Sequence, residues 1–455
     1  MNTTTTNIDH YRRQYEDWAG QLPGQPLPWL RHTREHALER FAHLGFPTVR
    51  DEEWKYTRVT PIAEHPFTPA ANACVGLDED DIARLLIAGA NSHRLVFING
   101  HFTPPLSRPG RLPDGVTLGS LAAAVEQRPE PLEPYLGRVM DPEANGFCAL
   151  NTAFLTDGVY LHLPDGVVLD EPIEILFLTT RQTEAVFSQP RNLIVAGDGA
   201  QATVIEGYAS LGDSRHFTNA ITEIVAGDGA ALEHIRLQGE SDQAFHVATV
   251  QVRQGRDSRF TSHAFGLGGR LSRTDINTVL GGEGAECTLN GLYVAAGRRH
   301  VDFHTRIDHA RPRCTSRELY KGILDGGARG VFNGKIYVHP DAQQTDARQS
   351  NRNLLLSKRA EVDTKPQLEI YADDVRCSHG ATVGQLDEDA VFYLRSRGMD
   401  TATARHLLTY AFAGEVVAEI GGDEVRRRVE ERLAARLGEE HVIQQARQLT
   451  EGIEA

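Results

Sequence analysis

A short segment recurs along this chain, and it limits the folds that the chain can form. Residues 194–200 and residues 224–230 both read IVAGDGA, and residues 279–285 read VLGGEGA. In each copy two apolar residues precede a glycine-rich turn, and an alternating segment follows the turn. A unit this short cannot bury its own apolar face, so the copies must stack on one another.

The texture around these copies predicts strands. Short alternating segments separated by Gly and Asp run from about residue 95 to residue 385, and we predict no long helix there. The 30-residue spacing of the first two copies suits a β-solenoid with one long or two short strands in each unit. A fourth copy, ILDGGA at 323–328, begins 44 residues after the third, which predicts an irregular repeat or an insertion. Closely spaced strands also occur in β-sandwiches and double jelly rolls, so the spacing leaves those folds open.

Helical patterns flank the strand-rich region. Before it, apolar residues follow helical spacing up to a Gly and Pro pair, and after it Gly421 and Gly422 separate two amphipathic segments. We therefore predict an N-terminal helical domain at 1–92, a β core at 93–385 and a C-terminal helical domain at 386–455. The predicted helices cover residues 30–44, 78–89, 387–397, 401–420 and 423–437.

Composition excludes several classes of function. The 47 Lys and Arg residues against 62 Asp and Glu residues give a formal net charge of -15, which argues against binding to nucleic acid or anionic lipid. No apolar run reaches the roughly 18 residues of a membrane span, and the polar N-terminus lacks the apolar core of a signal peptide. Five scattered cysteines form a poor disulfide framework, so we expect a cytoplasmic protein. Arg329 stands where a nucleotide-binding P-loop ending at Gly334-Lys335 would need Gly, which argues against nucleotide hydrolysis.

Two histidine motifs are candidates for metal binding. His32, Glu35 and His36 match the H-x-x-E-H pattern of inverted zinc proteases, although we favour the polar flank of a surface helix.

The second motif lies on a predicted strand. His300, Asp302 and His304 alternate with apolar residues and so share one strand face. Such a set could be the facial triad of a cupin-like non-haem iron enzyme, or the solvated side of a half-exposed strand.

A third candidate site combines sulfur and nitrogen. Cys377 and His379 would share a strand face about 6–7 Å apart, and thiolate with imidazole suits iron, zinc or an iron–sulfur cluster. Two ligands cannot complete a tetrahedral site, so another chain or bound sulfide must supply the others. A buried cysteine beside a hydrogen-bonded histidine is the structural alternative.

The region around this pair resembles a known family. Residues 353–398, the preceding GKIYVHPDAQQTDARQ and the EEWKYT segment at 52–57 resemble the SufB/SufD family of iron–sulfur cluster assembly proteins. Gly380 follows His379 where the SufB branch would carry Glu, so the chain is more similar to the SufD branch. The resemblance implies a mainly β fold, a right-handed parallel β-helix between helical N- and C-terminal domains.

The resemblance also implies a function without catalysis of its own. Such a chain is a scaffold subunit that pairs with a SufB-type subunit and, through its C-terminal helices, with a SufC-type ABC ATPase that hydrolyses ATP. His379, and with less support Cys377, would hold iron or a transient iron–sulfur cluster at the SufB interface and support iron entry. An isolated chain could instead pair with itself. Such complexes have been linked to a reduced flavin, for which this sequence shows no motif. The alternative function is a cupin-like iron enzyme that uses His300, Asp302 and His304.

Overall fold

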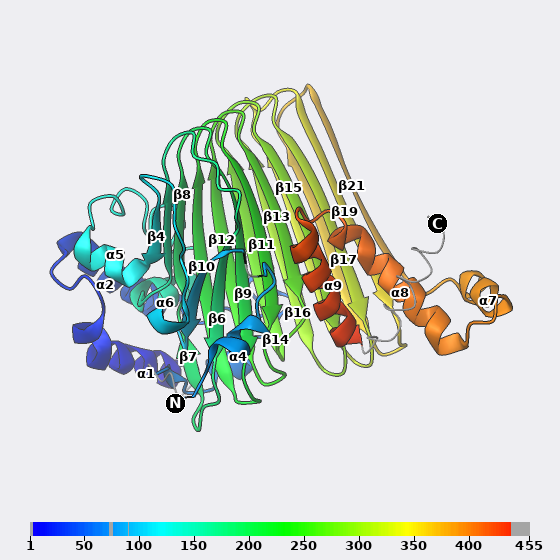
Figure 1. The fold of residues 1–455 in the computed structure, drawn as a ribbon, viewed down its shortest axis with the longest axis horizontal. Helices are drawn as coiled ribbons and strands as arrows, with labels where there is room; N and C mark the ends of the chain where they lie inside the picture. The colour runs from blue at the N-terminus through cyan, green and yellow to red at the C-terminus, as the bar shows by residue number, and fades with distance from the viewer. Residues whose placement is uncertain (1–2, 72–75, 90, 438–455) are drawn as a thin grey trace.

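The computed structural model describes residues 3–71, 76–89 and 91–437, and a long stack of parallel strands makes up most of it (Figure 1). Successive strands alternate between two sheets, so that two strands and their turns form one coil of a solenoid. Within the described residues the antiparallel ladders are the pairs β2–β3 and β4–β5, near the start of the stack. The parallel β-helix is thus confirmed, and the sandwich and jelly roll, which are antiparallel folds, are excluded.

The two sheets contain the following strands. Sheet A consists of β20 (Glu361–Ile370), β18 (Arg329–Val338), β16 (His300–His309), β14 (Leu271–Leu280), β12 (Phe245–Gln254), β10 (His216–Ala226), β8 (Arg191–Ala196), β5 (Val159–Leu163) and β4 (Thr117–Ser120), with β7 (Val186–Ser188) and β1 (Thr68–Pro69) to one side. Sheet B consists of β21 (Val375–Gly384), β19 (Thr345–Leu355), β17 (Thr315–Leu324), β15 (Glu286–Ala295), β13 (Arg259–Gly266), β11 (Ala231–Gly239), β9 (Gln201–Ser210), β6 (Ile173–Thr179), β2 (His93–Ile98) and β3 (His101–Phe102).

The repeated IVAGDGA segments form equivalent turns in successive coils. The Asp198 carboxylate accepts a hydrogen bond from the backbone N–H of Asp228 at 2.8 Å, and the Asp228 carboxylate accepts one from Arg256 N–H at 2.7 Å. Gly199 and Gly229 have φ near +67° and +68°, a conformation that favours glycine. The Asp and the second Gly of the motif therefore hold each turn onto the turn of the next coil.

The fourth copy of the repeat lies on the other side of the solenoid. The copies at 194–200, 224–230 and 279–285 follow strands of sheet A, whereas residues 323–328 follow β17 of sheet B. The spacing of 44 residues therefore spans a whole coil and part of the next. The repeat is regular there, and the expectation of an irregularity or insertion was wrong.

Helices cover the outer faces of the two sheets. The N-terminal helices and the EEWKYT segment share an apolar cluster with Phe217 and Phe245 of sheet A, and the last two helices share one with Ile235 and Leu292 of sheet B. The helices are α1 (Thr3–Trp18), α2 (Pro28–Leu44), α3 (Thr60–Ala63), α4 (Glu79–Ala83), α5 (Leu121–Gln127), α6 (Gly146–Ala153), α7 (Glu388–Ser396), α8 (Thr401–Val417) and α9 (Asp423–Leu437), with short 3-10 turns at η1 (Ala19–Gln21), η2 (Glu52–Trp54) and η3 (Pro104–Leu106). No described helix has the length and apolarity that crossing a bilayer requires.

Most predicted helices form where the sequence places them, but α4 is shorter than predicted. The Asp78 side chain caps its start, and the helix ends at Ala83 instead of residue 89. The backbone N–H groups of Ile87 and Ala88 donate instead to the buried carboxylate of Glu174 on β6. A tertiary hydrogen bond therefore ends this helix.

The solenoid interior is filled by aromatic side chains that lie against glycines. A Cβ atom at Gly291 would overlap the ring of Tyr320, and one at Gly322 would overlap the ring of Tyr293. Both tyrosines are fully buried.

We expect Gly291→Ala to destabilise the solenoid, because the Tyr320 ring would have to move within a close-packed interior. Overpacking of this kind costs about 1–3 kcal/mol. Gly380→Ala is the matched control, since no atom lies within 4 Å of the added methyl group there. Urea denaturation followed by circular dichroism measures both; equal midpoints for the two variants would contradict the packing described here.

Candidate functional site

One end of the solenoid is uncovered. Strand β20 pairs with β18 and strand β21 pairs with β19, and each is the last strand of its sheet in the described residues (Figure 1). Within residues 3–71, 76–89 and 91–437, no strand neighbours the outward backbone groups of these two ten-residue strands. Uncovered edges of this length are sites where another strand can add.

The sequence-predicted Cys377 and His379 both lie on β21, at this open end. Cys377 packs partly against a small apolar cluster that includes Ala347, which is its register partner on β19. Alternation along the strand places His379 on the same inward face, and its side chain is exposed because no coil follows. The structure therefore brings the predicted pair together at a surface, and the alternative of a core histidine does not describe His379.

The two side chains differ in how readily they can bind a metal ion. Partial burial raises the pKa of the Cys377 thiol, so the thiolate that a metal needs is disfavoured until a cation is present. Among the described residues no group of three or more His, Cys, Asp or Glu side chains has metal-binding geometry. A complete coordination shell at this end would therefore need donors from another molecule.

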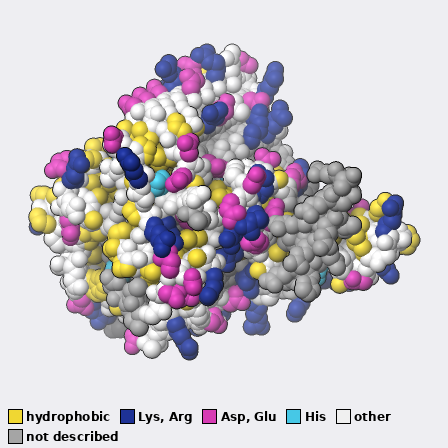
Figure 2. Space-filling view, in the orientation of Figure 1, with side chains coloured by type: hydrophobic (Ala, Val, Ile, Leu, Met, Phe, Trp, Pro, Cys, Tyr) yellow, Lys and Arg dark blue, Asp and Glu magenta, His cyan; other side chains and the backbone are white. Residues whose placement is uncertain are grey.

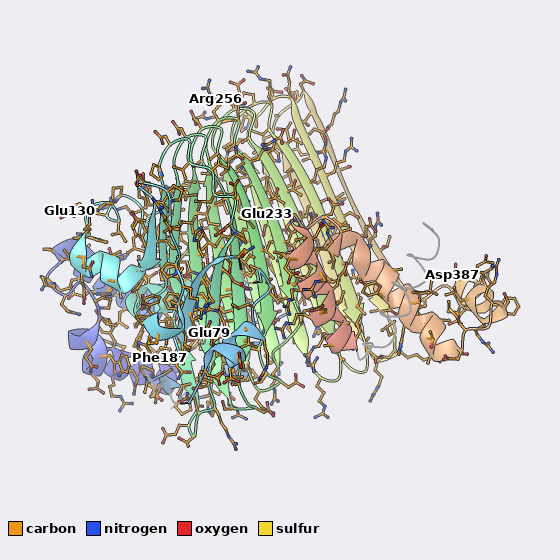
Figure 3. The ribbon with its side chains drawn as sticks, viewed as in Figure 1. Glu79, Glu130, Phe187, Glu233, Arg256 and Asp387 are labelled. Carbon is orange, nitrogen blue, oxygen red and sulfur yellow. The ribbon has the colours of Figure 1, made fainter. Side chains whose placement is uncertain are left out.

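Apolar side chains are exposed near the same end. Val383 on β21 and Tyr371 after β20 are half exposed or more, and Phe392 and Tyr393 on α7 are 70% and 56% exposed. Helix α7 projects from the body of the molecule, and hydrophobic side chains gather on this projection (Figure 2). Figure 3 shows Asp387, which caps α7, at the opposite end of the molecule from Glu130. Exposed apolar groups of this size are typical of protein-binding surfaces.

The candidate triad of His300, Asp302 and His304 has a different role. Asp302 accepts hydrogen bonds from Thr57 at 2.5 Å and from Arg273 at 3.2 Å, and His304 Nε2 lies 3.1 Å from its other oxygen. Burial by itself would raise the pKa of Asp302, but these cations hold it well below its usual range. The Arg273 guanidinium occupies the place beside the carboxylate that a metal ion would need.

This cluster fastens the EEWKYT segment to sheet A. Arg273 also donates to the backbone oxygen of Glu53 at 2.6 Å and lies over the Trp54 ring at 3.6 Å. Lys365 of the terminal strand β20 pairs with Glu52. The cupin-like iron enzyme is therefore wrong both in fold and in the use of these residues.

The H-x-x-E-H motif also forms no metal site in the structure. The rings of His32 and His36 are stacked 6.3 Å apart on α2, and His36 lies 3.6 Å from the exposed carboxylate of Glu143. The polar flank of a surface helix, which the sequence favoured, describes these residues.

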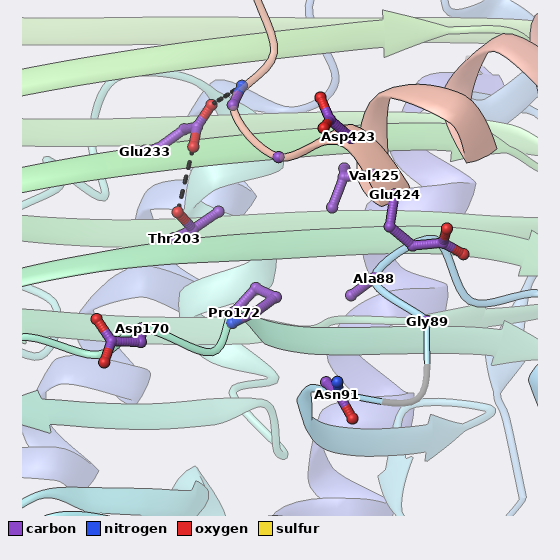
Figure 4. A pocket seen from close by; sticks show the side chains of 12 residues that line it. Ala88, Gly89, Asn91, Asp170, Pro172, Thr203, Glu233, Asp423, Glu424 and Val425 are labelled. Carbon is purple, nitrogen blue, oxygen red and sulfur yellow. Dashed lines mark hydrogen bonds between the residues drawn. The ribbon is translucent and has the colours of Figure 1, made fainter.

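A cavity of about 630 Å³ lies elsewhere, between the outer face of sheet B and the start of α9 (Figure 4). Its Glu233 accepts hydrogen bonds from Gly421 N–H at 3.0 Å and from the Thr203 hydroxyl at 3.2 Å, and it pairs with the buried His263. These contacts join the C-terminal segment to the solenoid. Because Glu233 serves this structural role, the open end is the candidate site.

The geometry defines a class of protein: a solenoid that presents an imidazole and a thiol on a strand with one unpaired edge, at a surface suited to another chain. Comparison with known proteins identifies the family. The family described as SUF system FeS cluster assembly, SufBD core domain, matches residues 177–412, and SufBD protein N-terminal region matches residues 5–175. The chain belongs to the SufBD family of iron–sulfur cluster assembly proteins.

Individual relatives match over most of their length. An iron–sulfur cluster assembly SufBD family protein of Synechocystis is 38% identical over 91% of this chain and 92% of its own. The iron–sulfur cluster assembly protein SufD of Escherichia coli is 34% identical over 88% of this chain and 91% of its own. A chloroplastic protein of Arabidopsis thaliana, ABCI7, is 28% identical over 90% of this chain and 86% of its own.

Other residues of the site were not predicted from the sequence. Glu318 and Gln349 face the solenoid interior beneath β21, and Lys321 on the outer face of β17 pairs with Glu415 of α8. Gln349 ends the GKIYVHPDAQQTDARQ segment, but alternation alone does not distinguish a buried glutamine from an exposed one. Lys321 pairs across 94 residues, a contact that no local pattern reveals.

We expect Asp302→Asn to lower the free energy of unfolding by about 3–5 kcal/mol, because it leaves Arg273 and His304 buried without their counter-charge. Asp308→Asn on the same strand, which breaks a pair with half-exposed Arg306, should cost about 1 kcal/mol or less. Urea denaturation measures both changes.

The same comparison has a pH signature. A carboxylate with a lowered pKa stabilises the fold above its unfolded pKa, and this contribution is lost as the pH falls through the lower folded value. The stability of the parent chain should therefore fall more steeply below about pH 4 than that of Asp302→Asn. Parallel pH curves would contradict the ion-pair role of Asp302.

Proposed function

We propose that this chain is a non-catalytic scaffold subunit for de novo iron–sulfur cluster assembly. The observation that carries the proposal is the exposed His379 on the last described strand of the solenoid, whose outer edge is unpaired. In this proposal a SufB-type subunit covers the open end, and His379 ligates iron or the nascent cluster in the seam between the two chains. The cluster is cargo that the complex builds and releases, so a site with few permanent ligands suits this role.

The open end supports pairing with a second solenoid. Strands β20 and β21 leave their outward edges unpaired, and a partner with a similar end could extend both sheets. Ile370, Tyr371 and Val383 add apolar surface there. In the absence of a SufB-type subunit, the same edges could pair with a second copy of this chain.

His379 and Cys377 would share the ligation unequally. The imidazole of His379 is exposed and can bind a metal through a neutral nitrogen without further change in the protein. The Cys377 thiol must lose a proton that its surroundings favour keeping. We therefore assign the main ligand to His379 and a secondary role, in ligation or in iron entry, to Cys377.

We expect His379→Ala to abolish cluster build-up while leaving the fold and the partner complex intact, because the side chain is exposed and lies outside the packed core. Ser378→Ala, which changes the outer face of the same strand, should retain normal iron and sulfide. Iron and acid-labile sulfide in the complex purified after co-expression with SufB- and SufC-type partners measure the effect. Normal cluster content in His379→Ala would refute the site assignment.

The C-terminal helices support docking of a SufC-type ATPase. Helix α8 is held on sheet B by the buried Lys321, which donates to the backbone oxygen of Phe412 at 2.8 Å and pairs with Glu415. Helix α7 projects beyond it with Phe392 and Tyr393 exposed. We propose that ATP binding closes two such ATPases and displaces these helices, so that the contacts of α8 with β17 transmit the movement to the seam.

We expect Phe392→Ser to weaken recovery of the ATPase at least tenfold in a pull-down, because an exposed aromatic anchor on α7 would be lost. Leu44→Ser, which removes an exposed leucine at the C-terminal end of α2, is the matched control and should leave recovery unchanged. Undiminished recovery with Phe392→Ser would show that the ATPase binds elsewhere.

Several further assignments belong to this proposal. The division at 1–92, 93–385 and 386–455 remains a prediction, and residues 438–455 of the last part lie outside the described residues. A location in the cytoplasm and a flavin in the assembled complex are likewise predictions. We place ATP hydrolysis in the SufC-type partner.

A further inference from the structure

A column of inward side chains leads from the solenoid interior to the open end. Register pairing aligns Glu318 on β17 with Gln349 on β19, and Gln349 with His379 on β21. Neighbouring strands of a sheet lie about 4.8 Å apart, so Gln349 is one layer and Glu318 two layers below His379. Both interior side chains are almost completely buried.

The contacts of this column fix the orientation of the Gln349 amide. Its Nε2 donates to Oε2 of Glu318 at 2.7 Å, and the other oxygen of Glu318 accepts from the Thr305 hydroxyl. An ionised carboxylate accepts hydrogen bonds and does not donate them, so the amide nitrogen must face Glu318 while Glu318 is ionised. The amide also occupies the space that a side chain at Gly334 of β18 would fill, so Gly334 makes room for it.

This orientation leaves one buried acceptor unused. Oε1 of Gln349 has no hydrogen-bond partner, although the atom is inaccessible to solvent. An unsatisfied buried polar group costs about 1–3 kcal/mol. The next layer outward in the column is that of His379, whose imidazole carries a suitable N–H.

We propose that Gln349, oriented by Glu318, is the positioning residue for His379: its Oε1 accepts a hydrogen bond from one ring nitrogen, so that the other nitrogen faces the seam as a metal ligand. The inference rests on the proposed function for the metal, but the hydrogen bond itself lies within one chain. Histidines that ligate metals donate their second ring N–H to an oxygen acceptor in most known sites, which fixes tautomer and ring orientation. Burial raises the pKa of Glu318 to about 7, so this carboxyl is ionised, and able only to accept hydrogen bonds, above that pH.

The test uses the full chain with ¹⁵N-labelled histidine. Long-range ¹H–¹⁵N NMR reports which ring nitrogen of His379 carries the proton, and His379→Ala assigns its signals. The proposal predicts one dominant tautomer in the parent chain and a shift towards the mixture of a free imidazole in Gln349→Met, which keeps the shape and removes the acceptor. Gln367→Met on the outer face of β20 is the matched control and should change nothing.

Glu318→Gln provides a second, conservative variant. It leaves Gln349 in place but no longer forces the amide nitrogen towards position 318, so the His379 signals should move in the same direction as in Gln349→Met. A role confined to packing would leave the tautomer unmoved by either variant. Unchanged His379 signals in both variants, or a free-imidazole mixture already present in the parent chain, would overturn the proposal.

Cluster content separates this inference from the proposed function. In the complex co-purified with SufB- and SufC-type partners, Gln349→Met should lower the affinity for added Fe²⁺ about 10–100-fold. Loss of an orienting acceptor has an effect of this size in other metal sites. If Gln349→Met changes the His379 tautomer but neither Gln349→Met nor His379→Ala lowers iron binding, the hydrogen bond is supported and the metal role is refuted. Loss of iron in His379→Ala, with no effect of Gln349→Met on tautomer or affinity, would refute the positioning role alone.

Discussion

The hydrogen-bonded ladder between successive coils is the constraint on which the rest of this structure depends. Every interior coil pairs its backbone groups with the coil before it and the coil after it, and the parallel register is unbroken over ten residues in each pair from β12 to β18 of sheet A. In the part of the chain that the structure describes, the last coil has such pairing on one side only. The open end therefore follows from β21 being the last described strand of its sheet. For the same reason, inward side chains of β21 such as His379 lie at a surface.

The helical segments remain attached to this ladder at points close to the open end. The EEWKYT segment reaches Lys365 on β20 from the outer face of sheet A, and helix α8 reaches Lys321 on β17 from the outer face of sheet B. Arg352, the register partner of Lys321, pairs with the same Glu415. Two distant parts of the sequence thus contact the coils that support His379.

Much of the fold could be predicted from the sequence because its signals are local. The Gly-Asp-Gly turns need a positive φ at Gly199 and Gly229 and a carboxylate acceptor, and the alternation in between needs only a period of two. The location of the fourth copy on the other sheet could not be predicted, since the same turn chemistry serves both edges of a coil. Helix α4 ends earlier than predicted because Glu174, distant in sequence, accepts hydrogen bonds from the backbone N–H groups of Ile87 and Ala88.

The candidate site was predictable in part for the same reason. Cys377 and His379 are two residues apart on one strand, so their shared face follows from strand geometry. The ionic role of Asp302 was not predictable, because it depends on Arg273 from the neighbouring strand and Thr57 from the N-terminal segment. The column beneath His379 depends on a register over 31 residues from Glu318 to Gln349, which only the stacked structure reveals.

The most direct test of the account is amide hydrogen exchange along β20 and β21 in the isolated chain and in the chain co-purified with a SufB-type subunit. If the open end is the seam, peptides covering residues 361–370 and 375–384 should exchange at least tenfold more slowly in the complex, while the interior strand β12 exchanges at the same rate in both. Equal exchange of β20 and β21 in the two samples would place the partner elsewhere and leave His379 without the seam that its proposed role requires.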